Sequence, residues 1–383
     1  MKIGISLNML AQEDRKDFAV YMDNLRLADL AEPLGFDSLF ALEHHFTGYS
    51  MSPNPLQLLS YLAGRTKRIT LGTSVIVLPW HDPIRVAEQI ALLDVLSGGR
   101  CLFGFGRGAA RSEYTGFGIP MEEARQRFSE AAQIVMMALK QESFEFDGQF
   151  YKIPTISIRP RPFSNPERRL FASSVSPESA ELMAKLGFGM MVIMQNEWKK
   201  SAGDIKKYRQ MAADIGHVPP PPIILTNVSC AESREEAQER ARTYLGRKWD
   251  SIDAHYGFSD GKLGKIKGYE AYGAVAKTYE KLKDETARAK ATDFYVSIQI
   301  VGTPDDCIQQ IHELKQLTGM EHMISDFWYG GMPSDEAEVN LRLFADKVLP
   351  VVQRDQMFTD KLFTVKPHTT ETPAHGDVYV LPA

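Results

Sequence analysis

Hydrophobic residues along the chain alternate between short runs typical of buried strands and longer segments at helical spacing. The eight strand-like runs cover residues 2–7, 37–42, 69–78, 100–106, 169–172, 189–194, 223–228 and 323–329. Amphipathic helical spacing follows them, as over residues 83–96 and 197–215. Because strand and helix alternate throughout one chain, the pattern favours a barrel over an open doubly wound sheet. We therefore predict an α/β fold, a (β/α)8 TIM barrel with insertions.

Two segments interrupt this alternation, and a third follows it. Residues 144–151 place an Asp-Gly pair between aromatic runs, which indicates a short hairpin. Residues 247–292 are charged, glycine-bearing and aromatic, and a strand-like period returns only at about Phe294. We predict that residues 247–292 form a lid-like insertion in a barrel domain that spans residues 1–353. Residues 354–383, which are rich in threonine and proline, are expected to form a C-terminal tail or arm.

Charge and cysteine content narrow the class of protein. The formal net charge is −5, so there is no global basic footprint, and neither nucleic acid nor a membrane is expected as a partner. Cys101, Cys230 and Cys307 lie far apart, which argues against a disulfide framework and suits a reducing cytoplasm. The amino terminus turns polar too soon for a signal peptide, and no apolar run approaches the ~20 residues of a membrane span. We predict a cytoplasmic enzyme acting on a small molecule.

A pair of histidines follows the second predicted strand, in Glu43-His-His-Phe46. The carboxyl ends of barrel strands form the face that holds active sites, and neighbouring side chains on an extended segment point to opposite sides. We expect one of His44 and His45 to face the pocket and the other to support it through the barrel wall. Adjacent histidines chelate a metal poorly and no third ligand follows at helical spacing, so no metal site is predicted. The Trp80-His81-Asp82 turn is explained by a helix that begins at Pro83, and receives no catalytic role.

An arginine between glycines follows the fourth predicted strand, in Gly104-Phe-Gly-Arg-Gly108. Such an arginine can meet a phosphate beside exposed backbone N–H groups. After the fifth strand, Ser176 and Pro177 suit a helix start, which leaves Ser174 free for another role. Because the fourth and fifth strands are neighbours in a barrel, Arg107 and Ser174 are predicted to form a phosphate site.

Six stretches of the chain, spread between Lys2 and about Val352, form a specific combination of motifs. They are Glu43-His-His-Phe-Thr47, Leu71-Gly-Thr-Ser-Val-Ile-Val-Leu-Pro79, Asp82-Pro-Ile-Arg-Val-Ala-Glu88, Leu93-Asp94 with Ser97-Gly-Gly-Arg100, Phe103-Gly-Phe-Gly-Arg-Gly108, and Val301-Gly-Thr-Pro-Asp305. Together, though not singly, they resemble the bacterial luciferase-like family of flavin-dependent monooxygenases.

The resemblance implies a barrel that binds reduced FMN, and it assigns roles to individual residues. The expected catalytic residues are His44 and His45, with the family's catalytic histidine falling on His44. The expected cofactor-binding residues are Asn8, Ser74, Val75, Gly106, Arg107, Glu113, Ser173 and Ser174. Within this set, Arg107 and Ser174 contact the phosphate, and the segment at Ser74 and Val75 lies behind the isoalloxazine ring, where a non-proline cis peptide bond fits the family.

Two positions depart from the luciferases themselves. Gly106 stands where they carry a reactive cysteine, and Ser173 stands where they carry a glutamate before the phosphate serine. Both differences argue against light emission and against a long-chain aldehyde substrate.

The resemblance further implies that reduced FMN and O2 form a flavin hydroperoxide, which inserts one oxygen atom into a small organic substrate. Trp249, His255 and Tyr256, in the predicted lid, are candidate substrate contacts. Since the chain carries no Rossmann signature for a nicotinamide, reduced FMN is expected from a separate NAD(P)H-dependent flavin reductase, which makes this a two-component enzyme. A homodimer paired through the helices after the second and third strands is also expected.

Three alternatives stay open at this point. The same barrel could belong to a deazaflavin-dependent oxidoreductase that moves hydride without oxygen, or to a non-catalytic flavin-binding protein. The histidine pair and Arg107 favour FMN over deazaflavin, and the histidine pair and the long insertion argue against binding alone. A metal-dependent barrel hydrolase is disfavoured because the ligand pair usual on the first strand is absent and Asn8 is a poor substitute.

Overall fold

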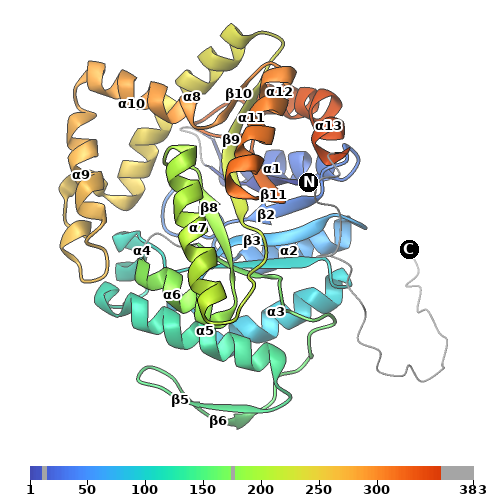
Figure 1. The fold of residues 1–383 in the computed structure, drawn as a ribbon, viewed down its shortest axis with the longest axis vertical. Coiled ribbons are helices and arrows are strands. Elements are labelled where there is room, and N and C mark those ends of the chain that lie inside the picture. Colours follow the sequence, from blue (N-terminus) through green and yellow to red (C-terminus); the bar gives the residue numbers. More distant parts are fainter. Residues whose placement is uncertain (11–14, 174–176, 355–383) are drawn as a thin grey trace, which may run out of the picture.

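The protein folds as a closed barrel of parallel strands surrounded by helices (Figure 1). The computed structural model describes residues 1–10, 15–173 and 177–354. The barrel strands are β1 (Lys2–Leu7), β2 (Ser38–Ala41), β3 (Thr70–Val77), β4 (Cys101–Gly106), β7 (Leu170–Ser173), β8 (Gly189–Ile193), β9 (Ile223–Cys230) and β11 (His322–Asp326). Each strand pairs in parallel with its neighbours, and the pairing of β8 with β9 closes the ring. The predicted (β/α)8 barrel is confirmed.

Helices cover the outside of the barrel. They are α1 (Asp17–Ala31), α2 (Pro55–Arg65), α3 (Pro83–Ser97), α5 (Ala124–Lys140), α6 (Pro177–Leu186), α7 (Trp198–Asp214), α8 (Arg234–Tyr256), α11 (Pro304–Thr318), α12 (Ser334–Lys347) and α13 (Leu349–Arg354). Local sequence explains where several of them begin. Asp82 accepts hydrogen bonds from the first backbone N–H groups of α3, and Thr303 and Asp306 form a reciprocal capping box on α11.

The barrel interior is filled by side chains rather than left as a channel. Six buried side chains from six different strands contact one another, which is possible only across the interior: Phe40, Leu102, Phe171, Met191, Ile223 and Ile324. Gly72 of β3 makes room for one of them, because a Cβ there would lie 2.2 Å from Cε1 of Phe40. The interior therefore acts as a solid base beneath the carboxyl ends of the strands.

The segment predicted as a lid-like insertion, residues 247–292, is mainly helical. Helix α8 continues through residues 247–256, and two short turns lead to α9 (Tyr272–Lys281) and α10 (Glu285–Ser297). In Figure 1, α9 and α10 stand to one side of the barrel. The expected return of a strand period at Phe294 is wrong: α10 buries Thr292, Tyr295 and Val296, which is helical spacing, and the short strand β10 starts only at Ile300.

The predicted hairpin, the cysteines and the predicted tail can each be compared with the structure. β5 (Phe144–Asp147) and β6 (Lys152–Ile156) form the predicted antiparallel hairpin, at the lower edge of Figure 1. The three cysteines are free and buried. No helix in the described part of the chain combines the length and apolar character that a membrane crossing requires. Of the predicted tail, residues 355–383 lie outside the described residues.

Candidate active site

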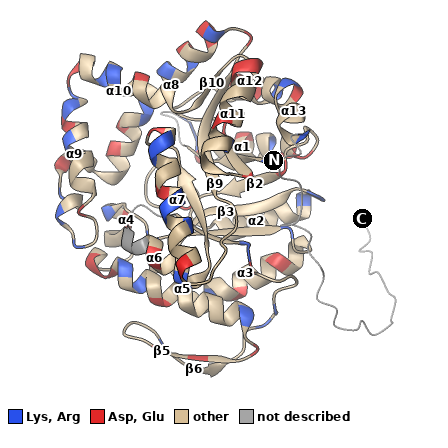
Figure 2. Cartoon of the chain, viewed as in Figure 1, with Lys and Arg blue, Asp and Glu red and all other residues tan. Residues whose placement is uncertain are grey.

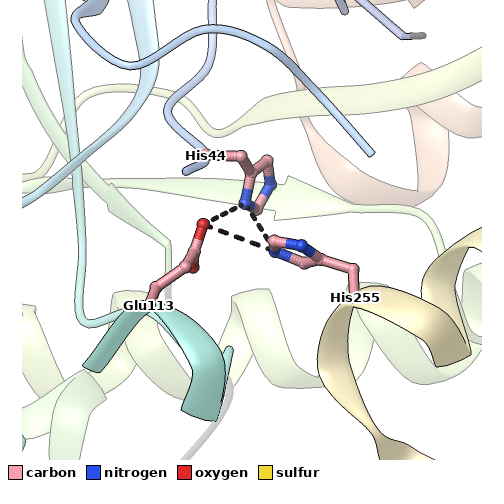
Figure 3. Close-up of side chains that lie close together, drawn as sticks. All are labelled: His44, Glu113 and His255. Carbon is pink, nitrogen blue, oxygen red and sulfur yellow. Dashed lines mark hydrogen bonds and ion pairs between the residues drawn. The ribbon is translucent and has the colours of Figure 1, made fainter. Parts of the chain in front are cut away.

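Three polar side chains from distant parts of the chain meet at the carboxyl end of the barrel (Figure 3). His44 follows β2, Glu113 lies in the short helix α4 (Arg111–Gly116) after β4, and His255 lies in the last turn of α8. Nδ1 of His44 is 3.2 Å from Oε1 of Glu113 and 3.1 Å from Nε2 of His255. The third side of the triangle, from Nε2 of His255 to Oε1 of Glu113, measures 3.4 Å. We call these three side chains the histidine–glutamate cluster.

Neighbouring groups fix the orientation of each member of the cluster. The backbone N–H of His45 donates to Oε1 of Glu113 at 2.7 Å. Nδ1 of His255 lies 2.7 Å from the hydroxyl of Thr47, and Nε2 of His44 lies 3.4 Å from the hydroxyl of Tyr256. The ring of Tyr49 stacks on His255 with centroids 4.7 Å apart. The cluster is thus held by contacts on every member.

Burial and hydrogen bonding set the charges in the cluster. The side chains of Glu113 and His255 are 1% and 0% exposed, and that of His44 is 16% exposed. Burial raises the pKa of Glu113, but hydrogen bonds with His255 and His44 outweigh it and hold this pKa at about 2. Burial lowers the pKa of His44 more than Glu113 raises it, and burial raises the pKa of Tyr256 well above its ordinary value. Near neutral pH, Glu113 is ionised while His44 is neutral and Tyr256 keeps its proton.

His45 points to the other side of the segment, as predicted. Its Nε2 lies 3.0 Å from Oε1 of Glu43, which is also 2.6 Å from Nε2 of His81. The backbone N–H of Val77 donates to the second oxygen of Glu43 at 2.8 Å. Burial alone would raise the pKa of Glu43, but these hydrogen bonds lower it. His81, which received no role from the sequence, therefore helps to hold the buried carboxylate that supports the histidine pair.

Strand β3 supplies the predicted backbone feature. The peptide bond between Ser74 and Val75 is cis, which confirms the expectation drawn from the resemblance. Among the described residues, the hydroxyl oxygen of Ser74 is buried and has no hydrogen-bond partner. Val75 also explains why Gly106 is glycine: a Cβ at position 106 would lie 2.4 Å from Cγ2 of Val75.

Arg107 lies over the ring of Tyr269, a residue of the segment between α8 and α9. Its guanidinium carbon is 4.1 Å from the ring centroid, and the Tyr269 hydroxyl donates to the carbonyl of Gly108 at 2.8 Å. Nη1 of Arg107 is buried and has no hydrogen-bond partner within the described ranges. Arg125 of α5 lies alongside, since a Cβ at Gly268 would be 3.4 Å from Nη1 of Arg107 and 3.6 Å from Nε of Arg125. Sequence analysis did not identify Arg125 or Tyr269 as part of this region.

Four residues that the sequence predicted for the site have no contact with the cluster among the described interactions or lie outside the described residues. The side chain of Asn8 contacts the Ser6 hydroxyl and donates to the carbonyl of Trp328 at 3.4 Å. Trp249 donates to the Thr292 hydroxyl at 3.0 Å, between α8 and α10, so the structure does not bring it to the cluster. Ser173 is partly buried at the end of β7, and Ser174 lies outside the described residues.

A second polar group at the strand ends was also missed by sequence analysis. Nζ of Lys248 lies 3.7 Å from Oδ2 of Asp326, which accepts a hydrogen bond from Asn227 at 2.8 Å. Burial raises the pKa of Asp326, and burial of Lys248 is outweighed by its acidic and phenolic neighbours, which raise its pKa. Neither residue belongs to a motif, so nothing in the sequence marks the pair.

Comparison with known proteins identifies the family. A family model described as luciferase-like monooxygenase matches residues 1–322. The chain belongs to the luciferase-like monooxygenase family. The match confirms the predicted enzyme class, a flavin-dependent monooxygenase.

Relatives and solved structures agree with this assignment. The alkanal monooxygenase alpha chain of Photorhabdus luminescens is 28% identical over 338 residues, which cover 88% of this chain and 92% of the relative. A monooxygenase named RslO1 from Streptomyces bottropensis is 27% identical, with a TM-score of 0.77 over 92% of this chain and 100% of that one.

Two structures of lower sequence identity share the fold of this luciferase-like monooxygenase, and their names give two different cofactors. The oxygenating constituent of 3,6-diketocamphane monooxygenase from Pseudomonas putida, in complex with FMN, is 20% identical, with a TM-score of 0.71 over 91% of this chain and 98% of that one. An F420-dependent secondary alcohol dehydrogenase is 18% identical, with a TM-score of 0.68 over 91% and 98% of the two chains. The fold by itself therefore does not choose between these two cofactors.

We predict that Gly106→Cys, which restores the residue expected in luciferases, destabilises this luciferase-like monooxygenase. The new Cβ would collide with Val75, which costs about 1–3 kcal/mol in the free energy of unfolding. Adding Val75→Ala removes the colliding methyl group and should recover part of the loss. Denaturant unfolding measures both changes. The matched control is Gly203→Cys, where a Cβ meets nothing within 4 Å. Equal stability of wild type and Gly106→Cys would contradict the prediction.

Proposed function

We propose that this protein is a two-component monooxygenase that uses FMNH2 from a separate NAD(P)H-dependent flavin reductase to insert one oxygen atom of O2 into a small organic substrate. The observation that carries the proposal is a set of three buried polar atoms without hydrogen-bond partners in the described structure: Nη1 of Arg107, Oγ of Ser74 and Oε2 of Glu113. Buried polar groups are normally satisfied, so these atoms are available to a polar ligand. All three belong to residues that the sequence assigned to cofactor binding.

The side chains present fit a flavin phosphate and its ring. Arg107 and Arg125 offer two positive charges beside the same short segment, and Tyr269 holds Arg107 in place. Arg107, Arg125 and Ser174 would hold the phosphate, and the strand segment at Ser74 and Val75 would lie behind the ring. When bound and reduced, the flavin supplies the electrons that activate O2.

The histidine–glutamate cluster would manage a proton beside the cofactor. His44 is a neutral imidazole near neutral pH, because burial lowers its pKa, and an imidazole can both take up and release a proton. The ionised Glu113 orients His44 and stabilises it when it takes a proton. Tyr256 holds a hydroxyl near Nε2 of His44, so a substrate that displaces it would be within reach of the imidazole.

The segment 247–292 would act as the lid that excludes water. It contributes His255 and Tyr256 to the cluster, and Tyr269 to Arg107, so it contacts both ends of the proposed site. Because the same segment touches the proton-handling and the phosphate-binding groups, its closure would couple cofactor binding to exclusion of water.

We predict that Arg107→Ala weakens FMN binding by about 10- to 100-fold, because it removes a charge-assisted hydrogen bond to phosphate. Anaerobic titration of the protein with reduced FMN, monitored by the fluorescence of the protein, measures this change in affinity. Arg242→Ala, which removes an exposed arginine of α8 that pairs with Asp293, should bind like wild type. If wild type binds F420 and not FMN, the deazaflavin alternative replaces this proposal.

We predict that His44→Ala lowers the yield of oxygenated product per flavin oxidised and slows turnover by roughly 10²–10⁴-fold, while FMN affinity changes little. Rapid mixing of the reduced-flavin complex with O2, in the presence of candidate substrates, measures both quantities. The matched control is His217→Ala, which removes an exposed histidine that is not part of the cluster. Identical reoxidation of wild type and His44→Ala, without product, would favour a non-catalytic flavin-binding protein. Turnover with NADH alone would exclude the separate reductase.

We further propose a homodimer formed through α2 and α3. Four large apolar side chains are exposed on these two packed helices: Tyr61, Leu92, Val95 and Leu96. Exposed apolar surface of this kind is often an interface. Light scattering should give a dimer mass for wild type and a monomer mass for Leu92→Glu/Leu96→Glu. The control Val339→Glu changes an exposed residue of α12 and should stay dimeric. A monomeric wild type would contradict this proposal.

A further inference from the structure

The histidine–glutamate cluster has a second chemical property besides proton handling. Its three facing atoms are two imidazole nitrogens and one carboxylate oxygen, and all of them lie within 4.8 Å of one another. Two histidines and one glutamate are a common ligand set for Zn²⁺ in enzymes. The ligands come from the segment after β2, from α4 and from α8, which is why the local spacing of His44 and His45 gave no metal prediction.

The distances between the three ligand atoms fit a tetrahedrally coordinated ion. Ligand atoms about 2.0–2.1 Å from a tetrahedral zinc are separated from one another by about 3.3 Å. The three sides measured here are 3.1, 3.2 and 3.4 Å. Shifts of a few tenths of an ångström would therefore admit the ion, and no backbone rearrangement is required. Figure 3 shows the three side chains pointing toward one another, with the pairwise contacts forming a triangle.

The outer contacts of the two histidines suit metal binding. Nδ1 of His255 faces the Thr47 hydroxyl, and Nε2 of His44 faces the Tyr256 hydroxyl. If each of these outer nitrogens carries the proton and donates it, both inner nitrogens present lone pairs toward Glu113. Metal-bound histidines are usually oriented by such an outer hydrogen bond. In that tautomeric state two lone pairs and a carboxylate face one another, which requires a cation between them; without a cation, an imidazole N–H donates to Glu113 instead.

The carboxylate offers more than one ligand atom. Oε1 of Glu113 belongs to the triangle and also accepts the backbone N–H of His45. Oε2 is buried and has no hydrogen-bond partner in the described part of the chain. Glu113 can therefore bind an ion through either oxygen or both. The His44 side chain is 16% exposed, so the cluster is not fully sealed from solvent, and a water molecule would supply the fourth ligand.

We propose that His44, Glu113 and His255 form a Zn²⁺ site. This inference goes beyond the proposed monooxygenase and does not rest on it, because it requires only the three side chains and the flavin-free protein. Occupation by Zn²⁺ blocks the inner nitrogen of His44, so the zinc-bound protein has no free imidazole at that position. The ion and the catalytic proton are thus alternative occupants of the same cluster.

Titration of tag-free, chelator-treated apoprotein with Co²⁺ tests the site directly, because four-coordinate Co²⁺ has an intense visible absorption. Wild type should bind one equivalent with this absorption, and added Zn²⁺ should abolish it. Glu113→Gln and His255→Ala should each weaken binding by at least about 100-fold. Thr47→Val, which leaves all three ligands in place and removes only the outer partner of His255, should weaken binding by about 10-fold.

The matched control, His217→Ala, removes an exposed histidine that is not part of the cluster, and it should bind Co²⁺ like wild type. X-ray absorption at the zinc edge of the wild-type protein gives a second measurement that depends on no variant, and it should show two histidine nitrogens and carboxylate oxygen at about 2.0–2.2 Å. The proposal is overturned if wild type binds no stoichiometric Co²⁺, or if Glu113→Gln and His255→Ala bind it as tightly as wild type. FMN titration without metal reports on the monooxygenase separately, so the two ideas can fail independently.

Discussion

The buried carboxylate of Glu113 is the constraint on which the site depends. It is ionised, almost fully inaccessible to water, and surrounded by one backbone N–H and two imidazoles. An isolated buried carboxylate would be strongly disfavoured, so the donors around it are required for the folded state as well as for chemistry. Because those donors come from the segment after β2 and from the last turn of α8, the charge ties the barrel to the segment 247–292.

A second buried carboxylate, that of Glu43, is also surrounded by imidazoles and a backbone N–H. Glu43 accepts from His45, His81 and the backbone of Val77, so the two histidines that are adjacent in sequence serve two different carboxylates. Because Glu43 contacts both His45 and His81, these contacts hold the segment after β2 that carries His44. The ring of His45, which the sequence predicted to be catalytic, therefore shares a buried carboxylate with His81.

The helical segment after β9 completes the site at two places. The last turn of α8 places His255 and Tyr256 beside His44. The loop between α8 and α9 places Tyr269 beside Arg107. The barrel side of the site carries His44 and Arg107, and this segment supplies residues that contact both of them. The same contacts create the converging nitrogens and oxygen that suit a divalent ion, so a proton-handling cluster and a metal-binding cluster require nearly the same geometry.

The sequence by itself determined the barrel, the helix starts at Asp82 and Thr303, the opposed directions of His44 and His45, and the turn that carries Arg107. These features follow from hydrophobic period, capping residues and strand alternation, which act between residues close in the chain. Only the tertiary structure placed His255 against His44, 211 residues away, and placed Trp249 against Thr292 instead of the site. It also extended helical structure through Phe294, because the side that α10 buries is set by packing on α8. Such contacts depend on the length and rotation of whole helices over a closed barrel, and no local pattern records them.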